Sequence, residues 1–161
     1  MAARVGIGYD LHRLLPGRPL LLGGVRLPFD SGLLGHSDAD VVLHALCDAL
    51  LGALGQPDIG ELFPDSDPRW KDADSRIFVA EALRRMRASG YALANVDLVI
   101  HAERPRLGPY KEQIRTSLAN LLGIPPQDVG VKAKSNEGTD AVGRGEAIAC
   151  WVVALLTARP G

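Results

Sequence analysis

The apolar residues of the chain fall into segments with different spacings. Val5, Ile7 and Tyr9 alternate with glycines, which predicts a strand whose glycine face lets another backbone or a ligand approach closely. Two leucine- and valine-rich runs, 20–22 and 25–27, flank a pair of glycines. Two glycines in a row supply the positive φ angles of a tight turn, so these runs predict a hairpin.

Helical spacing follows in three places. A polar loop at 34–40 opens a helix that runs to about Leu54, an amphipathic helix covers 74–89, and a third helix ends at Leu122 before Gly123. Buried strands are predicted at 96–102, from residue 129, and in the last apolar run at 147–158. We therefore expect an α/β (α+β) fold: one domain, 1–161, with a mixed β-sheet and helices packed mainly on one face.

Two polar stretches invite a local interpretation. Ser37 and Asp40 lie three residues apart before the first helix and resemble a capping box. The stretch 58–68 mixes prolines and four acids with Ile59, Leu62 and Phe63. A solvated linker would lack those apolar residues, so we expect an ordered loop that covers a ligand, with an acidic surface turn as the alternative.

Composition narrows the class of protein. The chain has 161 residues, 47% of them apolar, and a net charge of -1, with no basic stripe for nucleic acid. Its start lacks a signal peptide, and its longest apolar run is shorter than the roughly 20 residues of a membrane span. We expect a cytoplasmic protein without nucleic-acid or membrane partners. Cys47 and Cys150 lie in core-like segments and are expected to be reduced packing residues.

The strongest candidate chemistry is a metal site. Asp10 and His12 are two residues apart on a strand and therefore point to the same face. His44, one helical turn from both Asp40 and Asp48, is the best third ligand. Three ligands with a fourth position open are typical of catalytic zinc. The alternative is a chance Asp-x-His pair.

Other polar residues are candidates for phosphate binding. His36 precedes a helix N-terminus, where backbone N–H groups attract anions. Ser135 and Glu137 lie in a polar loop after a strand and suit phosphate and a hard cation such as Mg²⁺. Residues 102–108 end another strand and form a candidate pocket wall, and Arg144 is spaced to pair with Glu146. For His36 and for the loop with Ser135 and Glu137, the alternative is an ordinary surface loop.

Taken together, these motifs closely resemble the 2-C-methyl-D-erythritol 2,4-cyclodiphosphate synthases of the non-mevalonate isoprenoid pathway. The resemblance covers nearly the whole chain. The motifs that carry it are, in order, 8–12, 35–40 with His44, 58–65, 95–97, 131–133 and 143–146.

The resemblance implies roles for individual residues. Asp10, His12 and His44 match zinc ligands, and Glu137 matches a Mg²⁺ or Mn²⁺ ligand. His36 and Ser135 match transition-state stabilisers, which makes them the expected catalytic residues. The residues expected to bind substrate are Asp10, His12, His36, Ser37, Asp58, Ile59, Gly60, Phe63, Asp65, Asp67, Ala102, Arg106, Leu107, Gly108, Ala133, Lys134, Ser135, Asn136, Glu137 and Arg144.

The resemblance also implies a reaction and an assembly. The 2-phosphate of a cytidyl diphosphate substrate would attack the β-phosphorus, releasing CMP, in a homotrimer with active sites between subunits. Two departures stand out: Ser135 replaces the usual threonine, and residues 139–141 replace Leu-Gly-Phe. The spare acids Asp38, Asp40 and Asp48 keep a zinc-dependent phosphohydrolase open as an alternative, and a non-catalytic module that binds phosphate or isoprenoid ligands is another.

Overall fold

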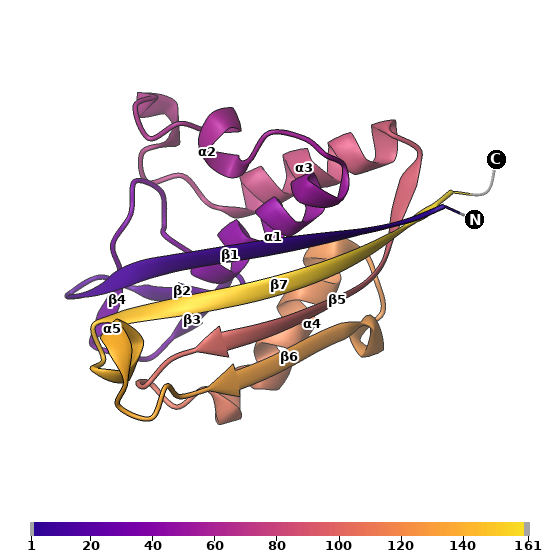
Figure 1. Ribbon diagram of the computed structural model, residues 1–161. Coiled ribbons are helices and arrows are strands. Elements are labelled where there is room, and N and C mark those ends of the chain that lie inside the picture. Colours follow the sequence, from indigo (N-terminus) through magenta and orange to yellow (C-terminus); the bar gives the residue numbers. More distant parts are fainter. Residues whose placement is uncertain (1, 160–161) are drawn as a thin grey trace.

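Two long antiparallel strands, β1 (Ala3–Pro16) and β7 (Ala147–Ala158), run side by side through the middle of the sheet in the computed structural model, which describes residues 2–159 (Figure 1). β5 (Tyr91–His101) pairs antiparallel with β7, and β6 (Val129–Lys134) pairs parallel with β5. With β4 (Ser31–Leu33), the strand order is β4-β1-β7-β5-β6. The predicted mixed sheet is confirmed.

The helices lie on one face of this sheet, as predicted. Figure 1 shows α1 (Val41–Ala53), α3 (Arg76–Ala88) and α4 (Lys111–Leu122) behind the strands, where they enclose the apolar core. The remaining elements are short. Strands β2 (Leu20–Leu22) and β3 (Val25–Leu27) form the hairpin, and α2 (Ile59–Leu62) and α5 (Asp140–Gly143) are single helical turns. There are also 3-10 turns at Pro68–Trp70, Gly108–Tyr110 and Pro126–Asp128. The stretch 58–68, predicted as a loop, therefore contains a helical turn.

The glycines of β1 let α1 pack directly on the strand. A Cβ atom on Gly6 would lie 1.9 Å from the carbonyl oxygen of Ala49, and one on Gly8 would lie 1.8 Å from that of Ala45. Both distances are far below any van der Waals contact. The glycine face of β1 therefore serves close approach of a backbone, that of α1, as the alternation predicted.

The first helix begins differently from the prediction. Asp40, not Ser37, is its N-cap, and the Asp40 carboxylate accepts hydrogen bonds from the N–H groups of Val42 and Leu43. The capping box predicted for Ser37 is wrong, because Ala39 has a φ of 58° and breaks the helical path between the two residues. Asp40 also accepts hydrogen bonds from both glycines of the hairpin turn, which docks that turn onto α1.

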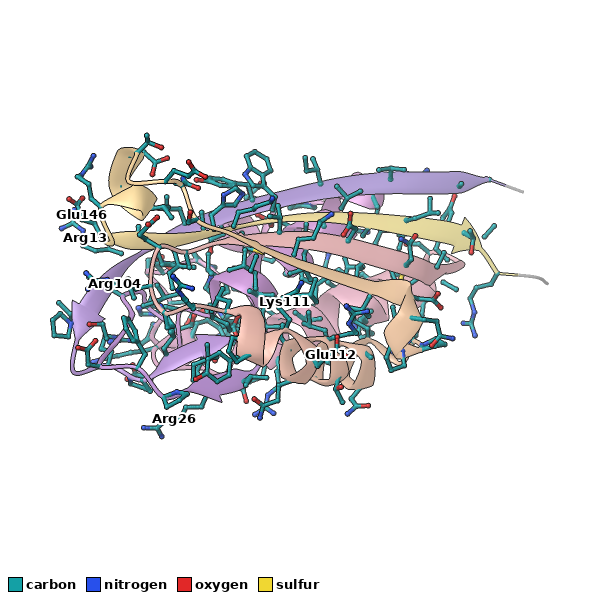
Figure 2. The ribbon with its side chains drawn as sticks, turned by 90° about the horizontal axis from the view of Figure 1, so that it is seen from below. Arg13, Arg26, Arg104, Lys111, Glu112 and Glu146 are labelled. Carbon is teal, nitrogen blue, oxygen red and sulfur yellow. The ribbon has the colours of Figure 1, made fainter. Side chains whose placement is uncertain are left out.

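The opposite face of the sheet is apolar and has little cover. Val5 and Ile7 of β1 are 66% and 61% exposed, and the Tyr9 ring packs against that of Trp151 with centroids 4.3 Å apart. Figure 2 shows α4, which begins at the labelled Lys111, on one side of the strands and side chains projecting from the other. Apolar patches of this kind on a small protein mark interaction surfaces.

Three smaller predictions can be compared with the structure. Gly123 ends α4 in the left-handed conformation, as expected, with a φ of 69°. Cys47 and Cys150 are buried and free. Within residues 2–159, every helix is too short or too polar to cross a membrane.

Candidate metal centre and adjoining pockets

Asp10 and His12 on β1 and His44 on α1 converge on one point. Oδ2 of Asp10 lies 2.8 Å from Nε2 of His12 and 3.1 Å from Nδ1 of His44, and the two ring nitrogens are 3.1 Å apart. Their potential ligand atoms all lie within 4.8 Å of one another. His44, more than 30 positions from Asp10 and His12 in the sequence, thus completes the predicted triad.

The surroundings of the triad favour positive charge at its centre. Burial alone would raise the pKa of Asp10, but the His12 and His44 side chains, which lie close to its carboxylate, outweigh it and hold that pKa well below its usual value. Burial also opposes a charged His12, yet the hydrogen bond to Asp10 raises its pKa. The carboxylate of Asp10 and the two imidazole rings thus favour positive charge between them.

The donor set fits a divalent transition metal. Nδ1 of His12 lies 3.0 Å from the carbonyl oxygen of Leu34, which can only accept, so this nitrogen carries the hydrogen and Nε2 keeps its lone pair for the centre. One carboxylate oxygen with two imidazole nitrogens suits zinc better than calcium or magnesium, which prefer oxygen ligands alone. Three protein ligands leave a tetrahedral ion one position for a substrate.

The triad opens into a cavity of about 390 Å³. Besides Asp10 and His12, six residues predicted to bind substrate lie on its wall: His36, Ser37, Ile59, Gly60, Phe63 and Asp65. Two other residues predicted to bind substrate, Asp58 and Asp67, use their carboxylates in hydrogen bonds with nearby residues. The Asp58 carboxylate caps α2 by accepting the N–H of Glu61, and the Asp67 carboxylate binds Arg69. The Asp67 carbonyl oxygen instead accepts a hydrogen bond from Nε2 of His36, which orients that ring.

One wall of this cavity is aromatic. Phe63 packs on Phe78 with ring centroids 4.6 Å apart, and Trp70 stands edge-on to Phe63 at 5.2 Å. The sequence analysis did not identify Trp70 or Phe78, because an isolated aromatic residue gives no signal of which cavity it will line. The result is an apolar surface beside a metal site, suited to a short carbon skeleton.

The three spare acids have different positions. Asp40 is fully buried and binds four backbone N–H groups, and Asp38 accepts hydrogen bonds from both the hydroxyl and the N–H of Ser75. Only Asp48 lines the cavity. Burial raises the pKa of Asp48, and the nearby carboxylates of Asp58 and Asp10 add to that rise. Of the three, Asp48 alone could act on a molecule in the cavity.

A second pocket, of about 690 Å³, lies at the ends of β5 and β6. It brings together seven residues predicted to bind substrate: Ala102, Arg106, Leu107, Gly108, Ala133, Lys134 and Ser135. Lys111 at the start of α4, labelled in Figure 2, also lines it and was missed. With Arg106 and Lys134, Lys111 gives this pocket three basic side chains, which suits a diphosphate.

The loop after β6 is held by its own hydrogen bonds. Oδ1 of Asn136 lies 2.9 Å from Nδ1 of His101, and Nδ2 of Asn136 donates to Asp140 at 2.8 Å. Asp140, with a φ of 59°, also caps α5. Three residues predicted to bind substrate, Asn136, Glu137 and Arg144, do not line this pocket in the single chain. Arg144 instead pairs with Glu146 at 2.8 Å, as its spacing predicted.

Fold and site together define a mixed α/β protein with a candidate three-ligand metal site between its first strand and first helix. The profile of the YgbB family matches residues 3–157. The 2-C-methyl-D-erythritol 2,4-cyclodiphosphate synthase of Moorella thermoacetica is 53% identical over 156 residues, which cover 97% of this chain and 96% of that protein. The chloroplastic synthase of Oryza sativa is 52% identical over 153 residues, covering 95% and 69%.

A solved structure agrees with these sequence matches. The CDP-bound form of 2C-methyl-D-erythritol-2,4-cyclodiphosphate synthase superposes with a TM-score of 0.89 at 44% identity, covering 96% of this chain and all of that one. The chain belongs to the YgbB family, the family of the 2-C-methyl-D-erythritol 2,4-cyclodiphosphate synthases. The resemblance stated from the sequence motifs is therefore confirmed.

Proposed function

We propose that this enzyme converts 4-diphosphocytidyl-2-C-methyl-D-erythritol 2-phosphate to 2-C-methyl-D-erythritol 2,4-cyclodiphosphate and CMP. The observation that carries the proposal is the convergence of Asp10, His12 and His44 at the wall of a cavity in a chain of this family. The substrate's 2-phosphate attacks the β-phosphorus of its diphosphate, and the bond from that phosphorus to the oxygen of CMP breaks. The whole chain acts as one synthase domain.

The reaction needs charge neutralisation more than a base. A phosphate nucleophile is already ionised at neutral pH, so no residue has to remove a proton from it. The difficulty is to bring two anionic groups together, which hydrogen-bond donors and cations make possible. In our proposal His36 and Ser37 donate to the attacking phosphate, and Ser135 donates to the diphosphate. Because ring closure is intramolecular, positioning supplies much of the remaining acceleration.

Two metal ions complete the proposed site. Asp10, His12 and His44 would hold Zn²⁺, and Glu137 would hold Mg²⁺ or Mn²⁺. Bound there, the ions supply Lewis-acid neutralisation of phosphate oxygens. The Glu137 side chain is exposed beside the basic pocket, which leaves its carboxylate available to a cation.

The substrate would span both pockets. Asp58, Ile59, Gly60, Phe63, Asp65 and Asp67 would contact the methylerythritol, where the aromatic wall supports a carbon skeleton. The cytidyl diphosphate would lie against Ala102, Arg106, Leu107, Gly108, Ala133, Lys134, Ser135, Asn136 and Glu137. Arg144 completes the proposed substrate-binding set.

We propose that three copies of the chain assemble with active sites between them. Two observations support this assembly. The outer face of β1 and β7 is apolar and has little cover, and the metal site and the basic pocket are separate cavities in one chain. If the metal site of one copy faces the basic pocket of the next, the assembly both buries the apolar face and completes the site.

The oligomer proposal is tested by one substitution with a matched control. Ile7→Glu places a charge on the 61% exposed residue of the outer face, and we expect a trimer-to-monomer shift by light scattering. Ile77→Glu changes a residue that is 50% exposed on α3, away from that face, and should leave the mass unchanged. A trimeric Ile7→Glu variant would refute the proposed interface.

The reaction is tested with the cytidyl substrate in ¹⁸O-labelled water. Intramolecular cyclisation predicts CMP and a cyclic product that both lack the label. A phosphohydrolase would place ¹⁸O in its product, and Asp48, half-buried in the cavity wall with a raised pKa, is the residue that favours this second candidate. Absence of CMP would instead indicate a module that binds phosphate or isoprenoid ligands without catalysis.

The identity of the metal at the triad can be tested directly. Metal analysis of the purified protein, with an anomalous-scattering map at the zinc edge, should place one zinc ion at the triad.

A cytoplasmic location is proposed for this chain, supported by two buried free cysteines. Its Oryza sativa relative is chloroplastic. A tagged chain found in another compartment would refute that location.

A further inference from the structure

Ser75 occupies a helix-capping position without capping the helix. It is the N-cap of α3 and is completely buried, yet its side chain makes no cap hydrogen bond. The N–H of Arg76 is bound by Asp74 instead. A serine at this position normally turns its oxygen toward the first helical N–H groups. Here Oγ lies 2.8 Å from Nε2 of His44, so its oxygen faces the metal-site histidine instead.

Asp38 determines the direction of that hydrogen bond. The Asp38 carboxylate accepts from the Ser75 hydroxyl, from the Ser75 N–H at 3.1 Å and from the Asp40 N–H at 3.1 Å. Because each Asp38 oxygen already accepts a backbone N–H, Asp38 is the acceptor and the hydroxyl hydrogen of Ser75 points to it. The Ser75 oxygen can then only accept from His44, which places the ring hydrogen of His44 on Nε2.

The consequence lies at the other nitrogen of the ring. With its hydrogen on Nε2, His44 presents the Nδ1 lone pair to Asp10 and His12, 3.1 Å from each. The reversed tautomer would direct an N–H group at the centre and remove one ligand. We propose that Asp38 and Ser75 are positioning residues that hold His44 as the Nε2–H tautomer and so make Nδ1 a metal ligand. This inference rests on the proposed metal site.

Ser37 sets the size of the expected effect. Its oxygen lies 3.1 Å from Nε2 of His44, farther than that of Ser75, and accepts from the N–H of Ala39 at 3.3 Å. When Ser75 loses its hydroxyl, Ser37 remains as a weaker acceptor. Ser75→Ala should therefore weaken Zn²⁺ binding about 10-fold, the lower end of the range for loss of a partner behind a metal-binding histidine.

Asp38→Asn should have the larger effect, because it changes the direction of the hydrogen bond between Ser75 and His44 as well as its strength. The asparagine amide offers one oxygen and one NH₂ group to three donors, so at least one donor loses its acceptor. When the NH₂ group faces Ser75, the serine hydrogen turns to Nε2 of His44 and the ring hydrogen moves to Nδ1. We expect about 100-fold weaker Zn²⁺ binding.

The experiment uses two readouts on the full-length protein. Zn²⁺ affinity is measured by competition with a chelator, and the His44 tautomer is measured in the metal-free protein by long-range ¹H–¹⁵N correlation. Wild type should show the Nε2–H form, and Asp38→Asn should show an Nδ1–H population. Ser117→Ala and Asp97→Asn remove comparable hydrogen-bonding groups elsewhere and should change neither readout.

The outcomes separate this inference from the proposed function. Zn²⁺ affinities within about twofold of wild type in both variants, with His44 still in the Nε2–H form, would overturn the positioning role. A wild-type protein that binds no Zn²⁺ would overturn the proposed metal site. In that case the tautomer spectra would still decide whether Asp38 and Ser75 orient the ring.

Discussion

Replacing Gly8 by alanine tests how the fold builds the metal site. Gly8 lies on β1 two residues before Asp10, and α1 passes so close that a Cβ on Gly8 would lie 1.8 Å from the carbonyl oxygen of Ala45. Ala45 is the residue after His44 on the helix. The added methyl group therefore presses on the two elements that carry the triad, at the point where they meet.

The size of the perturbation follows from the contact distances. Ordinary van der Waals contact begins at 3.4 Å, so β1 and α1 must separate by about 1.6 Å to accept the methyl group. The oxygen belongs to the backbone and the backbone fixes the position of the Cβ, so no side-chain rotation relieves the clash. Overpacking of this kind costs about 3 kcal/mol or more, which lowers the melting temperature by roughly 6–12 °C for a chain of this length.

The same separation acts on metal binding. Metal–ligand distances tolerate about 0.2 Å, so a shift several times larger should remove His44 from the ligand set. We expect Gly8→Ala to bind Zn²⁺ at least about 10-fold more weakly than wild type, as measured by chelator competition. Circular dichroism at a temperature below both transitions checks that the variant is folded.

Gly52→Ala is the matched control. Gly52 lies on α1, and a Cβ there would sit 3.7 Å from the carbonyl oxygen of Ile7 on β1, an ordinary contact. Alanine should raise stability by about 0.5–1 kcal/mol, because glycine is unfavourable inside a helix, and Zn²⁺ affinity should not change. Wild-type melting temperature and Zn²⁺ affinity in Gly8→Ala would refute the argument that the glycine contact sets the geometry of the triad.

Three further predictions address other parts of the molecule. His44→Ala should stay folded and lose its zinc, and a wild-type zinc content by elemental analysis would contradict the assignment. Hydrogen bonds from Arg84 and Arg85 lower the pKa of Glu81 to about 2 from its usual 4.5, so this carboxylate stabilises the fold above pH 4.5 and the effect disappears as the pH falls toward 2. Glu81→Gln should thus lower the free energy of unfolding by about 0.5 kcal/mol at pH 7 and leave it unchanged at pH 2, as measured by denaturant unfolding. An equal decrease at both pH values would contradict this. Asp140→Gly keeps the positive φ but loses the bonds to Asn136, Val142 and Gly143, so amide hydrogen exchange at 142–143 should accelerate, and unchanged exchange would show that the cap is unimportant.

Much of the fold is visible in local sequence patterns. The alternation of Gly6 and Gly8 with apolar residues predicted both the strand and the close approach on its glycine face. Glycine pairs predicted the hairpin, and Gly123 predicted the end of α4. These predictions succeeded because periodicity and glycine conformation depend on neighbouring residues alone. The segment 58–68 was predicted less well, since its short helix depends on a cap and on packing beneath it.

The site residues likewise fall into those that local sequence predicted and those that it could not. That Asp10 and His12 share a face follows from the period of a strand, and His44 was the natural third ligand. The roles of Asp38, Asp40 and Ser75 could not be predicted, because each depends on a partner that tertiary structure brings near. Asp40 was considered as a spare acid and instead caps α1 and holds the hairpin turn, while Ser75 occupies the N-cap position of α3 and contacts His44 instead.

The sequence by itself therefore determined the elements, the face on which the first two ligands lie, and, through its motifs, the family. Only the tertiary structure decided which carboxylate meets the cavity and which hydroxyl orients His44. It also separated the metal site from the basic pocket and left one apolar face of the sheet with little cover. The physical reason is that hydrogen-bond direction and cavity lining depend on contacts between distant residues, which exist only after the helices have packed on the sheet.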